Sequence, residues 1–250
     1  MDVKEKVILI TGGAGGLGSV MAEFLCRSGA MVYILDLDQE KGENVTKGLR
    51  EQNWEAEFIK MDLTSEEDWK KTVDLICEKA QRIDILINNA GINIRKPIEE
   101  MSIHEWDKMM LINTGSVFLG CKYVIPVMKK QGEGCIINTS SVCGLIGHKY
   151  TPEAYTATKG AVTLLTKAIA SRYAQFGIRC NSIHPSTVRT PLVEEMLKDP
   201  KKAEERLGEV PLGRLATAED IANAVVYLSS REASFINGIS LPIDGGVTCY

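Results

Sequence analysis

Histidine and closely spaced cysteine are scarce in this sequence, which bears first on metal binding. The three histidines, His104, His148 and His184, share no ligand spacing, and the seven cysteines include no C-x-x-C pair. A metal site needs several such ligands at short, regular spacing, so we expect none. The cysteines stand mostly in apolar runs, which predicts buried free thiols and favours a reducing, cytoplasmic location.

An excess of positive charge is also missing. The 29 lysines and arginines are outnumbered by 33 aspartates and glutamates, which gives a net charge of −4. Nucleic-acid binding needs a basic face, so we expect no such partner. The charged N-terminus is followed by no long apolar run, and no later run reaches membrane-spanning length. The sequence therefore predicts neither a signal peptide nor a membrane anchor.

Short apolar runs, in contrast, alternate with longer amphipathic stretches along the whole chain. Seven of these runs are predicted strands, at 6–13, 31–38, 55–63, 83–91, 134–141, 178–186 and 238–246. Runs that are apolar on both faces are typical of a parallel sheet covered on both sides. We predict an α/β fold: one domain, 1–250, with a single Rossmann-type, doubly wound parallel seven-stranded sheet and helices on both faces.

Start signals place the helices between these strands. Ser65 and Ser102 each stand three residues before an acid, as in a capping box. Thr151 precedes Pro152, which predicts a capping residue ahead of a proline at the first helical position.

One segment breaks the alternation of strands and helices. Residues 187–216 are rich in charge and proline, and we expect them to form a substrate lid over the carboxyl edge of the sheet. Leu192, Val193, Met196 and Leu197 recur at helical spacing within it, which predicts an apolar face. Leu192 and Met196 are candidate substrate-pocket residues, together with Asn93 and Cys143.

The glycine-rich stretch "TGGAGGLG" at 11–18 joins the first strand to the first helix. Glycine permits a tight turn and lets backbone N–H groups and the helix N-terminus approach a pyrophosphate. Asp36 ends the second strand, where a carboxylate takes the ribose hydroxyls of a dinucleotide. A 2′-phosphate would meet like charge there, and no lysine or arginine stands at Gly15 or Leu37. The pattern favours NAD over NADP, with Asp62 in reach of the adenine.

Six further motifs follow in order: "NNAG" at 88–91, Asn113 in "LINTGSVF", Ser140–Ser141, Y-x-x-x-K at Tyr155–Lys159, "HPSTVRTP" and a terminal "IDGG". With the glycine stretch, this ordered set resembles the short-chain dehydrogenase/reductase family along essentially the whole chain. The resemblance implies an enzyme that transfers a hydride between a nicotinamide cofactor and an alcohol or ketone.

The resemblance also implies roles for individual residues. Tyr155 would be the acid/base, with Lys159 lowering its pKa and holding the nicotinamide ribose. Ser141, preferred over Ser140 because it keeps the frame with the following "VCG", would bind the substrate oxygen. Asn113 would position a proton-relay water. The cofactor-binding residues would be Gly12, Gly16, Leu17, Gly18, Asp36, Asp62, Leu63, Asn89, Tyr155, Lys159, Val188 and Thr190.

The spacing of Tyr155 and Lys159 has a physical reason. Residues at i and i+4 share one helix face, so the ammonium lies near the phenol. A free tyrosine has a pKa near ~10, and bringing it to about 7 needs roughly 4 kcal/mol of preference for the phenolate. A nearby lysine charge supplies part of this and oxidised nicotinamide could supply more.

The substrate is left open between two classes. The apolar lid and Cys143 favour an apolar, cyclic secondary alcohol, such as a terpenoid, a steroid or a cycloalkanol. Arg95 and Lys96 favour a sugar or a gluconate-type sugar acid. A non-catalytic NAD sensor is disfavoured because the Ser, Tyr and Lys set is complete. Two long, partly apolar helices, around 103–130 and 152–175, are where family members form dimers and tetramers, so we expect a homo-oligomer.

Overall fold

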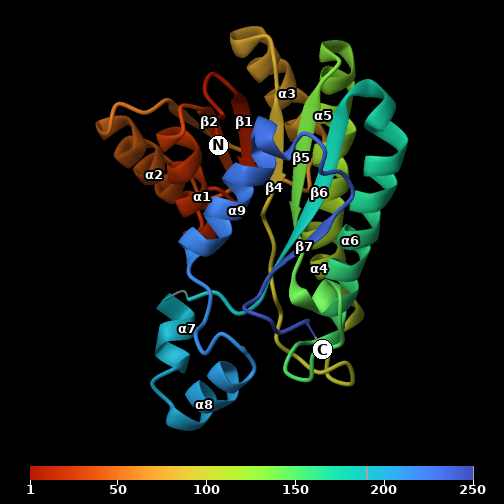
Figure 1. Cartoon of the computed structure of the whole chain (residues 1–250). Coiled ribbons are helices and arrows are strands. Elements are labelled where there is room, and N and C mark those ends of the chain that lie inside the picture. The colour runs from red at the N-terminus through yellow and green to blue at the C-terminus, as the bar shows by residue number, and fades with distance from the viewer. Residues whose placement is uncertain (190, 250) are drawn as a thin grey trace.

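The protein is built around one sheet of seven parallel strands. The structure is a computed structural model that describes residues 1–189 and 191–249. The strand order is β3-β2-β1-β4-β5-β6-β7, and Figure 1 labels all of these strands except β3. The strands are β1 Val7–Thr11, β2 Met31–Asp36, β3 Ala56–Lys60, β4 Ile85–Asn88, β5 Gly134–Thr139, β6 Ile178–Pro185 and β7 Ser240–Ile243. The predicted fold class is confirmed.

The strands are continuous apolar runs because both faces of the sheet are buried. In β1, Ile8 and Ile10 join one core cluster, and Val7 and Leu9 join the cluster on the other face. Successive side chains of a strand point to opposite faces, so both sets must be apolar. The predicted strands are longer than the observed ones because they include the turn residues at their ends.

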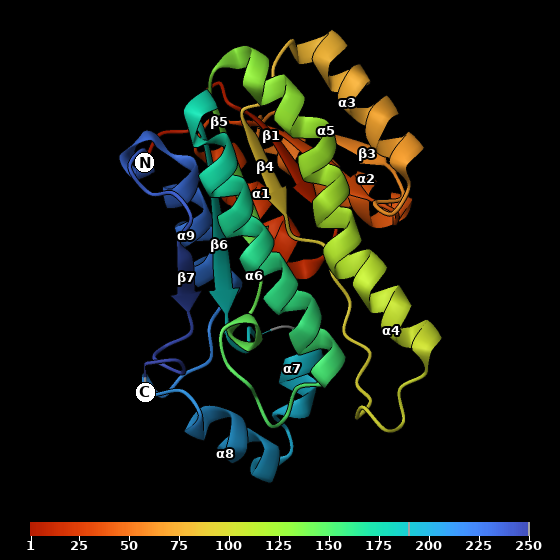
Figure 2. The same cartoon turned by 90° about the vertical axis from the view of Figure 1, so that its right-hand side faces the viewer.

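Nine α-helices are found in the part of the chain that the structure describes, and most of them lie in two layers. Helices α1, α2 and α9 cover one face, and α3, α5 and α6 cover the other, as Figure 2 shows. Their bounds are α1 Gly16–Arg27, α2 Gln39–Glu51, α3 Glu66–Ala80, α4 Ile103–Met110, α5 Ser116–Gln131, α6 Glu153–Tyr173, α7 Pro191–Met196, α8 Pro200–Gly208 and α9 Ala218–Ser229.

The two predicted capping boxes differ in how complete they are. At Ser102 both halves are present, because Ser102 accepts from the Glu105 N–H while the Glu105 carboxylate accepts from the Ser102 N–H. At Ser65 the hydroxyl accepts from the Asp68 N–H, but the Asp68 carboxylate accepts from the Asp62 N–H instead. Both serines therefore cap their helices as predicted, and one reciprocal bond is missing.

The predicted cap at Thr151 is wrong. Helix α6 begins at Glu153 with Pro152 as its N-cap and no side-chain capping bond. The Thr151 hydroxyl instead lies 2.9 Å from His148 Nδ1 and accepts from Cys143 Sγ at 3.3 Å. The hydroxyl therefore makes tertiary contacts in place of a capping bond to the helix.

The expectation that no segment reaches membrane-spanning length is also wrong. A five-residue π-helix, η1 Leu111–Gly115, joins α4 to α5. The resulting run, Ile103–Gln131, is long and apolar enough to pass a test of length and composition, with a mean hydropathy of 1.3 in its best window. Of that window 44% is buried, and α5 packs on β4, β5 and α3. This packing fits a core helix.

The predicted lid, 187–216, forms a separate small lobe beyond the carboxyl ends of the strands, with α7 and α8 in it (Figure 1). Its two ends meet in a parallel bridge between Val188 and Ala216. Val193, Val210 and Leu215 form a buried apolar cluster inside it. The segment therefore leaves and rejoins the sheet edge at one place.

Candidate active site

The glycine turn after β1 forms one end of a large cavity. Gly12 has a positive φ of 63°, which favours glycine. A Cβ on Gly18 would clash with the Gly12 carbonyl oxygen, so the turn and the helix pack too closely for a side chain. A Cβ on Gly16 would meet nothing within 4 Å, because it would point into open space. Helix α1 begins here without a side-chain cap, so its first N–H groups have no side-chain partner.

The variant Gly16→Ala tests whether this open space belongs to a cofactor. Gly48→Ala is a matched control, because a Cβ there also meets nothing within 4 Å and Gly48 lies in a helix away from the cavity. Both variants should fold, and Gly48→Ala should gain up to about 1 kcal/mol of stability. Only Gly16→Ala should weaken NADH binding, by about tenfold or more in a fluorescence titration. Equal affinities would contradict the assignment.

Asp36 ends β2, Asp62 follows the neighbouring strand β3, and both line the cavity. The Asp36 carboxylate accepts from the N–H groups of Ala14, in the glycine turn, and Asp38, both at 3.1 Å. Asp62 Oδ1 accepts from the Thr64 N–H and hydroxyl, at 2.8 and 2.7 Å. Both carboxylates are therefore held in place at the edge where the parallel strands end.

Asn89 ties the end of β4 to the glycine turn. Its N–H donates to Thr11 Oγ1 at 2.9 Å, and its Nδ2 donates to the carbonyl oxygens of Thr11 and Gly12. The side chain therefore braces the turn.

These groups line a cavity of about 850 Å³ at the point where the strand order reverses, between β1 and β4. Eleven of the twelve predicted cofactor residues line it: Gly12, Gly16, Leu17, Gly18, Asp36, Asp62, Leu63, Asn89, Tyr155, Lys159 and Val188. The twelfth, Thr190, lies outside the described residues. A glycine cradle at a helix N-terminus with a carboxylate beyond it fits a dinucleotide.

Tyr155 and Lys159 stand at the other end of this cavity. The Lys159 ammonium is buried, lies 5.6 Å from the centroid of the Tyr155 ring and donates to the Thr139 carbonyl oxygen at 2.8 Å. Ser141 lines the same cavity, and its Oγ accepts from the Cys143 N–H at 3.3 Å. The structure thus brings three of the four predicted catalytic side chains to one place.

The pKa of Tyr155 departs from the sequence-based expectation. The pKa of Tyr155 is raised to about 12, mainly by burial and further by the neighbouring Cys143 thiol. A hydrogen bond with Ser141 lowers the pKa but offsets only part of this rise. Burial also lowers the pKa of Lys159, to about 8. The pKa of the phenol therefore stays above its usual value in the protein alone, because burial outweighs the hydrogen bond with Ser141. A positive charge placed beside the phenol would lower this pKa.

This shift makes a spectroscopic prediction. Without cofactor, the difference between the ultraviolet titrations of wild type and Tyr155→Phe should show no phenolate at or below about pH 10, two units under that pKa. Saturating NAD⁺ should move the ionisation to lower pH, since positive charge favours the phenolate. A Tyr155 phenolate present near neutrality in the cofactor-free protein would contradict this.

Asn113 sits in the π-helix η1, which the sequence did not reveal. Its side chain accepts from the Ile92 N–H at 2.7 Å and donates to the Ile92 carbonyl oxygen at 2.9 Å and to Thr158 Oγ1 at 3.1 Å. A Cβ on Gly91 would lie 3.3 Å from Asn113 Oδ1 and 3.5 Å from Lys159 Nζ. Asn113 is fully buried behind Lys159. Single-turn π-bulges in helices are frequent at functional sites.

The two adjacent serines differ in their partners. Ser140 Oγ donates to the Lys159 carbonyl oxygen at 2.9 Å and lies 3.0 Å from Thr163 Oγ1, so it fixes β5 against α6. Ser141 keeps its hydroxyl toward Tyr155. This geometry favours Ser141 as the predicted substrate-binding serine.

His184 is a buried residue of the site that the sequence analysis considered only as a possible metal ligand. Its Nδ1 lies 2.8 Å from the Ser141 carbonyl oxygen, and its Nε2 lies 2.8 Å from Ser182 Oγ. Burial lowers its pKa, which keeps the imidazole neutral. The ring therefore positions the backbone of Ser141, and the "HP" dipeptide was the signal that could have found it.

A smaller cavity of about 250 Å³ adjoins the catalytic side chains. Ser141, Tyr155, Asn93 and Cys143 line it, with Val193 from the lid. The side chains of the other two predicted pocket residues, Leu192 and Met196, lie outside the described set. Sequence analysis missed the polar lining residues His148, Thr151, Arg206 and Glu209, which come from segments far apart in the chain.

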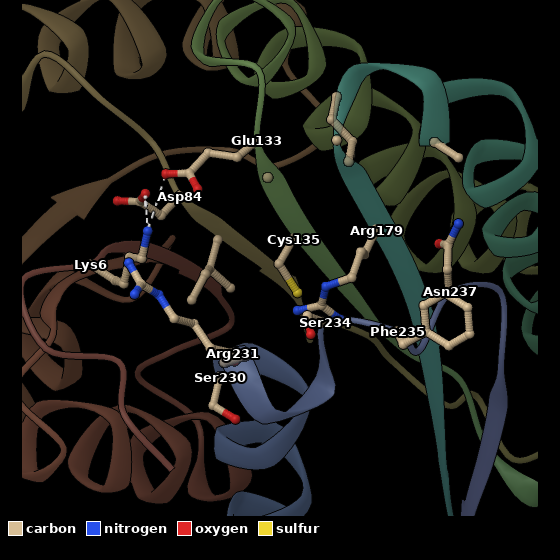
Figure 3. A pocket seen from close by; sticks show the side chains of 16 residues that line it. Lys6, Asp84, Glu133, Cys135, Arg179, Ser230, Arg231, Ser234, Phe235 and Asn237 are labelled. Carbon is tan, nitrogen blue, oxygen red and sulfur yellow. Dashed lines mark hydrogen bonds and ion pairs between the residues drawn. The ribbon is translucent and has the colours of Figure 1, made fainter.

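Another cavity, of about 630 Å³, lies at the opposite, amino edge of the sheet (Figure 3). Lys6 bridges the carboxylates of Asp84 and Glu133 there, at 3.0 and 3.2 Å, while Arg179 donates to two backbone carbonyl oxygens. Most of its charged groups thus serve internal contacts. No predicted site residue lines this cavity.

Known proteins with similar sequences show the family of this chain. A family model described as enoyl-(acyl carrier protein) reductase matches residues 12–248. Cyclopentanol dehydrogenase of Comamonas sp. (strain NCIMB 9872) is 44% identical over 246 residues, which cover 98% of both chains. The chain belongs to the short-chain dehydrogenase/reductase family. The predicted family and oxidoreductase class are confirmed.

Two further similarities show how the family varies. Trans-4-hydroxycyclohexanecarboxylate dehydrogenase of Sinomonas cyclohexanicum is 37% identical over 252 residues, 98% of this chain and 94% of that one. The structure of a gluconate 5-dehydrogenase from Burkholderia cenocepacia J2315 in complex with NADP and tartrate has a TM-score of 0.94 at 30% identity, covering 100% of this chain and 97% of that one. One short-chain dehydrogenase fold therefore serves cyclic alcohols and sugar acids.

Proposed function

We propose that this protein oxidises a secondary alcohol on a small carbocycle to the ketone, reversibly, with NAD(H). The observation that carries the proposal is the position of Ser141, Tyr155 and Lys159. Ser141 and Tyr155 line both the cofactor-sized cavity and the smaller one, and Lys159 lines the larger. The reacting carbon of a substrate in the small cavity can therefore meet a nicotinamide in the large one.

Each side chain has a distinct task in this reaction. The Ser141 hydroxyl hydrogen-bonds the substrate oxygen, and Tyr155 takes the proton from the carbinol hydroxyl, or returns it during reduction. Lys159 holds positive charge beside the phenol, and its contact with the Thr139 carbonyl fixes the ammonium. Asn113 braces the loop at Ile92 behind it. When bound in the larger cavity, NAD⁺ would supply the hydride acceptor and a positive charge near the phenol.

The size and walls of the smaller cavity support a small carbocyclic substrate. At about 250 Å³ it lies below the ~300–1,000 Å³ that is common for drug-sized ligands. Val142, Val193, Val210 and Val247 line it on the apolar side. The names of the two relatives, which specify cyclopentanol and trans-4-hydroxycyclohexanecarboxylate, support the same class.

Initial rates of NADH formation test the proposal. Cyclopentanol and cyclohexanol should be oxidised with kcat/KM at least about tenfold above that for gluconate, because the valines of the lining offer no hydrogen bonds to the several hydroxyl groups of gluconate. A clear preference for gluconate would replace this function with the sugar-acid alternative, which the exposed Arg95 in the same cavity favours.

Asp36 supports NAD over NADP as the cofactor. The carboxylate is held by two backbone N–H groups at the cavity wall, and the adjacent Leu37 offers no positive charge. Wild type should have a kcat/KM at least about tenfold higher with NAD⁺, and Asp36→Ala with Leu37→Arg should reverse the ratio. Equal efficiency of wild type with NADP⁺ would contradict this choice.

We also propose that residues 1–250 act as one catalytic unit with 187–216 as its lid, and that copies associate as a dimer or tetramer in the cytoplasm. Ile103, Leu111, Phe118 and Leu164, on α4 to α6, are 52–74% exposed. Such a patch fits a second copy of the chain. A monomer mass by light scattering would contradict association.

A further inference from the structure

The lining of the smaller cavity carries unbalanced positive charge. Its arginine, histidine and carboxylate side chains are Arg95, Arg206, His148 and Glu209. Glu209 Oε2 lies 3.5 Å from Arg206 Nη1 and 3.4 Å from His148 Nε2. The carboxylate is therefore matched within the protein by a guanidinium and an imidazole, and the remaining charge is that of Arg95.

Arg95 differs from its neighbour Lys96, which looks equivalent in the sequence. Lys96 forms an ion pair with Glu105 at 2.5 Å and does not line the cavity. No ion pair or hydrogen bond of the Arg95 side chain is found among residues 1–189 and 191–249. The Arg95 guanidinium is thus the cation at this cavity that is left for a ligand.

The lining also contains apolar groups. Five valines and Cys143 contribute to it, and the Cys143 thiol already donates a hydrogen bond to Thr151 Oγ1. A ligand that fills this space needs an alcohol at one end, an apolar body, and an anion at the other end. An arginine pairs best with a carboxylate, because its fork matches two oxygens.

We infer that the substrate is a cyclic secondary alcohol that also carries a carboxylate, and that Arg95 binds this carboxylate in the smaller cavity. The inference rests on the proposed function. Arg95 lines the smaller cavity and not the cofactor-sized one, so we expect its contact to be the same in the ground state and the transition state. It therefore lowers KM and leaves kcat nearly unchanged.

The test compares trans-4-hydroxycyclohexanecarboxylate with the corresponding carboxamide, which has the same shape and no charge. Wild type should oxidise the carboxylate with at least about tenfold higher kcat/KM, and the difference should lie in KM. In Arg95→Gln the ratio should fall close to one. Lys96→Gln is the matched control, one residue away with the same loss of charge, and should keep the wild-type ratio.

Two results would overturn the inference alone: equal kcat/KM for carboxylate and carboxamide in wild type, or an unchanged ratio in Arg95→Gln. In both cases the proposed function still holds if wild type oxidises cyclohexanol. Absence of turnover with cyclohexanol, the carboxylate and the carboxamide would overturn the proposed function, and the inference with it.

Discussion

Tyr155→Phe is expected to lower kcat by about 10²–10⁴-fold, the range that a positioned acid/base contributes. The phenol is the titratable group of the two cavities that stands beside both Ser141 and Lys159. Phenylalanine fills the same space without a proton to give or accept. NADH affinity should change little, because the ring remains and Lys159 keeps its bond to the Thr139 carbonyl.

Tyr173→Phe is the control for this prediction. Tyr173 lies at the other end of the same helix and packs beside Phe176, so loss of its hydroxyl should leave turnover unchanged. Stopped-flow kinetics and circular dichroism would compare the two variants. Substantial activity in folded Tyr155→Phe protein would remove Tyr155 from its proposed role.

Lys159→Met is expected to damage both turnover and cofactor binding. Methionine has nearly the same length, so the buried space stays filled, but the charge beside the phenol and the donor to Thr139 are lost. We expect kcat to fall by about 10²-fold or more, because the phenolate loses its nearest positive charge. The NADH dissociation constant should rise about tenfold, as for the loss of one charged hydrogen bond.

Lys167→Met provides the matched control, since Lys167 is exposed two turns further along α6. It should leave kcat and the NADH dissociation constant unchanged. If Lys159→Met lost turnover but bound NADH as tightly as wild type, Lys159 would act on the phenol alone and the proposed ribose contact would be wrong.

The sheet was predictable because its cause is local. Each strand is a short run that must be apolar on both faces, as Ile8 and Leu9 show within β1. The strand ends were less predictable. Residues 83–91 are predicted as one strand, yet β4 ends at Asn88. The next residue, Asn89, donates hydrogen bonds to the carbonyl oxygens of Thr11 and Gly12 at the glycine turn.

Contacts between residues far apart in the chain limited how much of the site could be predicted from the sequence. The π-helix has no local signal, since Asn113 is held by the backbone of Ile92, 21 residues earlier. The Thr151 hydroxyl contacts Cys143 and His148 and does not cap the helix. His148 and Glu209 are 61 positions apart in the chain and meet only through the packing of segment 187–216 in the folded protein. Motif order could predict Tyr155 and Lys159, and it could not predict which charges surround the substrate.

In the proposed reaction a hydride leaves the carbinol carbon for NAD⁺ in this cavity. Incubation with cyclopentanol deuterated at the carbinol carbon, followed by mass spectrometry of the reduced cofactor, follows that hydride. We predict one deuterium in each NADH formed, and about 10²–10⁴-fold less deuterated NADH when Tyr155→Phe replaces wild type over the same time. Reduced cofactor without deuterium, or ketone formed without reduced cofactor, would contradict the account.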